Sequence, residues 1–176
     1  MSIFLRLAAL GLGVASIGAC ADLKYGLQGT FSLPLDDLKT VTESGQGLGA
    51  GAFMDIRFRD GQALRPRVDF IQYPSRSTGG ETRQWSCQTI GVDYLYFTQG
   101  RFQGPYLAAG LGSRYYEVKV DINGRSNTGS NRKIGLTLGG GYVFTPHFEV
   151  NARYTRTSMD GGIQMGSVDL GAAYTF

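Results

Sequence analysis

The sequence of 176 residues is poor in the residue types that build catalytic and disulfide-bonded sites: it has two cysteines and one histidine. Two cysteines cannot form a disulfide framework, and a formal net charge of only +3 does not indicate a nucleic acid as a partner. Beyond residue 21 there is no convincing helical pattern, and no apolar run approaches the roughly 20 residues that a membrane-spanning helix needs. These absences direct attention to strands.

The first 21 residues differ from the remainder of the chain. One base, Arg6, precedes an apolar run that ends at Ile17, and small residues follow. This layout predicts a secretory signal peptide over residues 1–21, with a mature chain that begins at Asp22. The four residues that end at Cys20 also resemble the lipobox of bacterial lipoproteins, in which the cysteine is lipidated, so both fates of Cys20 stay open.

After the leader, polar or small residues alternate with apolar ones. A period of two predicts a strand with two unlike faces. In the fifth such segment the alternation slips near Tyr115 and Tyr116, which predicts a bulge. The eight segments are 23–33, 48–58, 63–73, 85–97, 105–120, 133–144, 148–155 and 167–176.

The charged residues of these segments gather on one face. The other face is nearly free of charge at mid-strand, where an exposed lysine or arginine in lipid costs about 2–4 kcal/mol. The charged set is Asp55, Arg57, Arg65, Arg67, Asp69, Asp93, Arg114, Glu149, Arg153 and Asp169. An open sheet edge in lipid would leave backbone groups unpaired, so the sheet must close. We therefore expect residues 22–176 to form an all-β, eight-stranded antiparallel up-and-down transmembrane β-barrel with the charged face inside.

An interior of eight strands is just wide enough to be filled by side chains. Because the interior set contains both signs of charge, we expect these residues to pair as a polar plug. The alternative is a narrow pore whose selectivity is set by Arg57, Arg65, Arg67 and Arg153.

Short and long connections alternate along the chain. Short links lie at 59–62, 98–103 and 145–147, and longer polar links at 34–47, 74–84, 121–132 and 156–166. Outer-membrane barrels have short periplasmic turns and longer outer loops. Bases in or beside the second and third long links are candidates for binding lipopolysaccharide phosphates. They are Arg76, Arg83, Arg125, Arg132 and Lys133.

The last eight residues carry the most specific motif. Asp169, Gly171, Tyr174 and the terminal Phe176 resemble the insertion signal that the barrel-assembly machinery reads. With the strand pattern, they make the chain similar to the OmpA/OmpX-type group of small, porin-like outer-membrane proteins. The resemblance is architectural and covers the chain after residue 21. It implies a bacterial outer-membrane location, with outer-membrane lipids, lipopolysaccharide and the assembly machinery as partners, but it names no extracellular partner.

No catalytic set accompanies the barrel pattern. His147 falls in a short turn, on the side away from lipid A, and Cys87 lacks a neighbouring base that would activate its thiol. The acids Asp36, Asp37 and Asp160 match no calcium loop. We therefore expect no enzyme, metal or cofactor, and a structural or surface-interaction role. The alternatives are a narrow passive channel and, less favoured, a lipid A-modifying enzyme of the outer leaflet.

Overall fold

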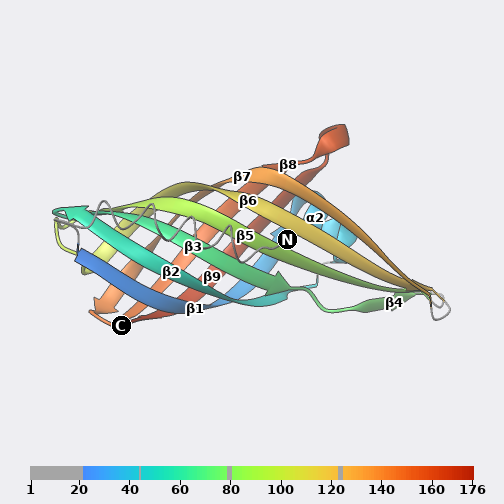
Figure 1. The fold of residues 1–176 in the computed structure, drawn as a ribbon, viewed down its shortest axis with the longest axis horizontal. Coiled ribbons are helices and arrows are strands. Elements are labelled where there is room, and N and C mark those ends of the chain that lie inside the picture. The colour runs from blue at the N-terminus through green and yellow to red at the C-terminus, as the bar shows by residue number, and fades with distance from the viewer. Residues whose placement is uncertain (1–21, 44, 79–80, 123–124) are drawn as a thin grey trace, which may run out of the picture.

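The structure, a computed structural model, describes residues 22–43, 45–78, 81–122 and 125–176. The predicted signal peptide and Cys20 lie outside the described residues. Eight of the described strands form a closed ring in which each pairs antiparallel with its neighbours, and β9 returns to β1 (Figure 1). They are β1 (Asp22–Leu35), β2 (Gly47–Arg59), β3 (Gln62–Gln72), β5 (Glu81–Phe97), β6 (Gly104–Ile122), β7 (Arg125–Thr145), β8 (Phe148–Ser158) and β9 (Gln164–Thr175).

Side chains alternate between the lumen and the outer surface along every strand of the ring. On β8, Glu149, Asn151 and Arg153 are buried, whereas the residues between them are exposed. The short turns and both ends of the described barrel lie at one end, to the left in Figure 1. The long connections lie at the other end, which we call the outer end.

The predicted loop over 121–132 is wrong in part, because β6 and β7 continue as a hairpin to Ile122 and Arg125. The bulge predicted at Tyr115 is also wrong, since β6 pairs one residue for one with both neighbours there. The apolar residues that suggested a slip, Val118, Val120 and Ile122, keep the inward direction. They lie on the part of β6 that extends beyond the end of β8, so they no longer line a polar lumen.

Two short helical segments lie in connections that were predicted only as longer polar links. The helix α2 (Asp36–Val41) follows β1, and the 3-10 turn η1 (Asp160–Gly162) links β8 to β9. A short strand, β4 (Arg76–Thr78), pairs with the start of β5 outside the ring. No helix in the described ranges has both the length and the apolar character to cross a membrane.

Candidate functional site: a filled lumen and an exposed flap

The short-turn half of the lumen is organised around Arg65. Its Nε and Nη2 donate to the two carboxylate oxygens of Asp55, at 2.6 and 2.9 Å. Its Nη1 and Nη2 donate to those of Glu149, at 2.5 and 2.9 Å. The Tyr106 hydroxyl donates to Glu149 at 3.0 Å, and the guanidinium lies 4.1 Å from the ring centroid of Phe53. The five side chains cross the barrel from β2, β3, β6 and β8.

Glycines on the inner face make room for these rings. A Cβ on Gly26 would lie 2.3 Å from the Phe53 ring, and one on Gly141 would lie 2.7 Å from the Tyr106 hydroxyl. Both distances are shorter than nonbonded carbon contacts allow. Glycine is therefore needed here for close approach across a narrow barrel.

A second cluster lies further toward the outer end. Arg67 donates from Nε to Asp93 at 2.8 Å and from Nη1 to Asp69. Arg153 approaches the same two carboxylates, at 3.6 Å from Asp69 and 3.7 Å from Asp93. All four side chains are buried. The pairing compensates for part of the cost of removing these charges from water.

A third group of polar side chains lies in the lumen close to its outer end. Ser32 donates to Asp169 at 2.5 Å and lies 3.1 Å from the Tyr73 hydroxyl. Arg114, only 1% exposed, donates to Ser167 at 3.4 Å. Arg57 stands apart from the rest of the charged set: it is half-buried at the short-turn end, 3.2 Å from Asp22.

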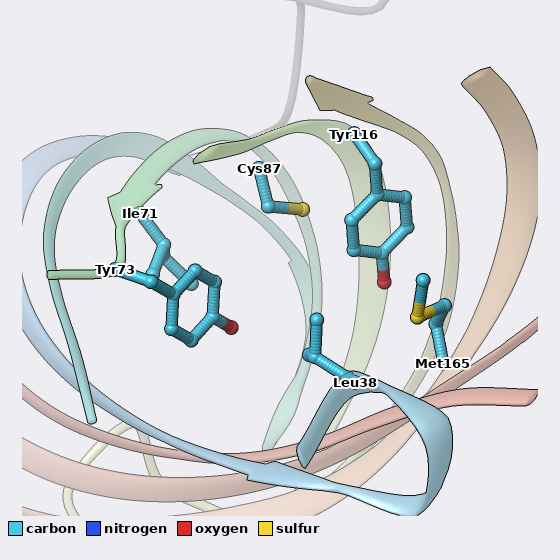
Figure 2. Packing of buried hydrophobic residues seen from close by; sticks show 6 residues of the cluster. All are labelled: Leu38, Ile71, Tyr73, Cys87, Tyr116 and Met165. Carbon is cyan, nitrogen blue, oxygen red and sulfur yellow. The ribbon is translucent and has the colours of Figure 1, made fainter. Parts of the chain in front are cut away.

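Apolar side chains close the lumen at its outer end (Figure 2). Leu38 of α2 is fully buried and points inward from the short helix. It forms one apolar cluster with five other buried side chains: Ile71, Tyr73, Cys87, Tyr116 and Met165. We call these six residues the outer cap. The Asp37 carboxylate holds α2 in place by accepting the Gln164 backbone N–H at 2.7 Å.

A second apolar cluster closes the short-turn end. It comprises Ala63, Leu95, Phe97, Tyr106, Ala108 and Val143, with Phe102 packed against it. Two cavities described between the clusters have volumes of about 10 Å³ each. Each has room for about one water molecule. The charge pattern of the strands did not predict either apolar cluster, although Ile71 and Cys87 continue the inward alternation of Asp69 and Thr89.

Beyond the outer cap, β4 and the outer parts of β5, β6 and β7 form a small sheet that projects from the barrel (right end of Figure 1). We call it the flap; it comprises 76–78, 81–86, 117–122 and 125–134. Segment 125–134 pairs with β6 but not with β8, whose pairing begins at Gly135. Among the described residues, this edge therefore has no strand on its other side.

The flap holds the five predicted lipopolysaccharide contacts without gathering them into one patch. Arg76 and Arg83 lie opposite each other across β4 and β5. Arg83 donates to Glu81, and this hydrogen bond lowers the pKa of the Glu81 carboxyl. Arg125 lies at the tip of β7. Arg132 and Lys133 are neighbours on one strand and so point to opposite faces.

The C-terminal motif is divided between the two faces of β9. Asp169 and Gly171 face the lumen, whereas Tyr174 and Phe176 are exposed on the outer surface with ring centroids 5.4 Å apart. His147 lies beside them: its Nδ1 is 2.8 Å from the Thr175 carbonyl oxygen, and its ring stacks on Tyr174. No group of three or more potential metal ligands occurs in the described part of the chain.

Charged residues are buried and large apolar residues are exposed. Asp93 and Arg114 are each 1% exposed, while Leu107, Leu136 and Ile134 are 61%, 66% and 71% exposed. In water such a surface would aggregate, whereas in hydrocarbon it is the favoured one. The closed ring and this inversion define a transmembrane β-barrel.

The chain belongs to the family of outer membrane protein beta-barrel domains, whose model matches residues 5–176. The predicted eight-stranded antiparallel barrel and the resemblance to small outer-membrane proteins are confirmed. The family is one of the bacterial outer membrane, where the barrel is surrounded by lipid.

Solved structures share the fold at low sequence identity. Ail, the attachment invasion locus protein of Yersinia pestis, matches with a TM-score of 0.67 and 14% identity, covering 89% of this chain and 99% of that one. The N-terminal barrel of Pseudomonas aeruginosa OprF gives 0.65 and 10% with the same coverage. Neisserial surface protein A gives 0.63 and 17%, again over 89% and 99%. No curated protein matches the chain significantly.

Proposed function

We propose that this protein is a non-enzymatic barrel that presents its flap outside the cell, with a structural or surface-interaction role. The observation that carries the proposal is the contrast between the two ends of the same strands. The lumen is filled by paired charges and capped by apolar clusters. The flap is exposed, and among the described residues its 125–134 edge pairs with no strand on the side away from β6.

A variant without the flap tip tests this role. Replacing residues 119–128 with an Asn-Gly turn joins Val118 to Gly129, which already lie opposite each other. We expect the variant to insert normally and to lose surface binding or envelope integrity in the producing bacterium. Unchanged surface binding and unchanged envelope permeability would contradict the proposal.

The alternative function, a narrow channel, is less well supported. Arg65 bridges Asp55 and Glu149 across the lumen, and the outer cap and the short-turn cluster lie on either side of the charges. An ion would have to break buried ion pairs to pass, at a cost of several kcal/mol. We expect planar-bilayer recordings to show no conductance steps. Steps whose ion selectivity changed in an Arg67 variant would favour the channel instead.

Lipid A chemistry has the least support. The only histidine lies in the turn between β7 and β8 and is engaged with Thr175 and Tyr174. That turn is at the opposite end of the barrel from the flap (Figure 1). Cys87 is buried in the outer cap. We expect the lipid A of an overexpressing strain to be unchanged in mass, and a new species would overturn this assignment.

Two partners are proposed with the role. The first is lipopolysaccharide, whose phosphates fit the exposed guanidinium groups of the flap. A structural relative, Ail, has been solved with the heparin analogue sucrose octasulfate, which is also an anionic sugar. The candidate contacts are Arg76, Arg83, Arg125, Arg132 and Lys133.

The second partner is the barrel-assembly machinery, which would act during insertion. The outward rings of Tyr174 and Phe176 are available to a recognising surface, and Asp169 and Gly171 complete the motif. Export would begin with the signal peptide, residues 1–21, and its cleavage before Asp22. Mass spectrometry of the membrane-inserted protein distinguishes that cleavage from lipidation of Cys20.

A further inference from the structure

The two charged clusters of the lumen lie next to each other without a direct link. We call the one in the short-turn half the Arg65 cluster and the one further toward the outer end the Arg67 cluster. Asn151 extends the Arg65 cluster, because its Nδ2 donates to Glu149 at 3.3 Å and to Gln28 at 3.0 Å. Within the described part of the lumen, no hydrogen bond or ion pair runs from one cluster to the other.

One of the two small lumen cavities lies between these clusters. Its volume is about 10 Å³, which is room for about one water molecule. Arg65 and Asn151 line it on the side of the first cluster, and Asp93 and Arg153 line it on the side of the second. Tyr106, Leu95, Ala108 and Gly140 complete its wall. A single small molecule in this cavity would therefore contact both clusters.

Three residues of the cavity wall carry a buried polar atom that has no hydrogen-bond partner in the protein. The atoms are Asp93 Oδ1, Asn151 Oδ1 and Arg153 Nε. Their residues are only 1%, 8% and 7% exposed. The ion pairs of Asp93 do not satisfy its Oδ1, because Arg67 and Arg153 both approach its Oδ2. Unpaired polar atoms at such depth are costly, and ordered water satisfies them where side chains cannot.

The three atoms specify the chemistry of their ligand. Two of them, on Asp93 and Asn151, are acceptors, and the Arg153 Nε–H is a donor. A cation would be repelled by the guanidinium groups of Arg65 and Arg153, and an anion would be repelled by the Asp93 carboxylate. A small neutral molecule that donates two hydrogen bonds and accepts one fits all three atoms.

We propose that one ordered water molecule binds in this cavity, donates to Asp93 Oδ1 and Asn151 Oδ1, and accepts from Arg153 Nε. The water joins the Arg65 and Arg67 clusters into one hydrogen-bonded network that fills the lumen. Because apolar clusters close both ends of the lumen, this water exchanges with bulk solvent only when the barrel opens locally. The site is independent of the flap and of the role proposed for it.

NMR detects the water directly in the parent protein. The sample is the full barrel with labelled arginine in phosphatidylcholine nanodiscs, studied by rotating-frame cross-relaxation with water. We expect a cross-peak between the Arg153 Nε–H and water with the sign of a close contact, which is opposite to the sign that proton exchange gives. Absence of this cross-peak would overturn the proposal.

A matched pair of substitutions locates the water. Ala108 lines this cavity and not the second one, which Arg153 also borders. Valine and threonine have nearly the same shape, but threonine brings a hydroxyl that can replace the water. We expect Ala108→Val to remove the cross-peak. In urea titrations its unfolding constant should exceed that of Ala108→Thr about fivefold or more, since three buried atoms then lack a partner.

The reverse order of these two variants, or equal unfolding constants, would overturn the proposal, because valine in a dry cavity only adds apolar contacts. The control pair is Ala63→Val and Ala63→Thr. Ala63 belongs to the same apolar cluster as Ala108 but does not line the cavity. There we expect threonine to be the less stable variant, because its hydroxyl is buried among apolar side chains. If neither variant at position 108 folds, the cross-peak of the parent protein decides.

An exchange of salt distinguishes water from a bound ion. Replacement of sodium chloride by potassium bromide at the same ionic strength should shift the urea midpoints of the parent protein and Ala108→Val equally, because no ion enters the cavity. A shift confined to the parent protein would overturn the water assignment in favour of an ion.

Discussion

The lumen and the flap are made from the same strands, and their side chains obey the same alternation. In the part of β6 that belongs to the ring, inward residues meet a polar interior, and Arg114 is buried there. A few residues later on the same face, Val120 and Ile122 border a hollow at the tip of the flap, and Ile122 is 48% exposed. The comparison teaches that alternation decides which way a side chain points, while the closure of the ring around it decides whether a charge there must find a partner.

The largest expected effect is in the lumen. Arg65→Leu removes the base shared by Asp55 and Glu149 and leaves two buried carboxylates facing each other. We expect a loss of about 3–5 kcal/mol in the free energy of unfolding, measured by urea titration in lipid vesicles. The matched change in the flap, Arg83→Leu, also removes the partner of a carboxylate but in solvent, and it should leave the unfolding midpoint unchanged. Similar shifts for the two variants would break the comparison.

The outer cap is expected to respond next. Leu38→Ala opens a cavity beneath α2 and should cost at least about 2 kcal/mol locally. Cys87 is buried in that cap, so its reaction with a maleimide should accelerate by about tenfold or more. The control is Val41→Ala at the rim of the same helix, which should accelerate labelling less. A labelling rate in Leu38→Ala equal to that of the parent protein would show that α2 does not seal the lumen.

Removal of the flap tip should have a smaller effect on stability. The Asn-Gly replacement of residues 119–128 deletes strand pairs outside the ring and leaves every ring closure intact. We expect the free energy of unfolding to change by less than about 1 kcal/mol. A large loss, or failure of the heat-modifiable gel shift that marks a closed barrel, would show that the flap supports the barrel.

The smallest effect concerns the surface pair of the flap. The hydrogen bond from Arg83 lowers the pKa of Glu81, so the charged carboxylate is favoured in the folded hairpin. This contribution is present above the ordinary carboxyl pKa and is lost as the pH falls through the lowered one. Arg83→Gln should raise the Glu81 pKa toward its ordinary value, which NMR titration of the labelled side chain would detect. No change would show that the pair does not persist in solution.

Much of the fold was predictable because a transmembrane barrel has a simple sequence rule. The two-residue period predicted all eight ring strands, and the charged face predicted which side chains, such as Arg65 and Asp93, point inward. Arg57 has the same parity but lies near the short-turn end, where water reaches it. The two-residue alternation predicts whether a side chain points inward but not how far it lies from the end of the barrel. The sequence therefore could not separate Arg57 from the buried charged residues.

The ends of the strands were less predictable. Residues 121–132 are rich in polar and small side chains, which are typical of loops, yet they form a regular hairpin because β6 and β7 are already paired below them. Residues 34–47 were predicted only as a longer polar link, but α2 turns Leu38 into the lumen. Neither outcome has a local signature, because both depend on neighbours that the ring brings together.

By itself, the sequence determined the class of fold, the direction of each strand residue and that the outer face suits a lipid bilayer, since these follow from a period of two and from the cost of charge in hydrocarbon. Only the tertiary structure decided which charges pair, what caps the lumen and which edge of the described flap has no neighbouring strand. Those properties depend on distances between strands remote in sequence, such as Arg65 and Glu149, and closure of the ring sets these distances.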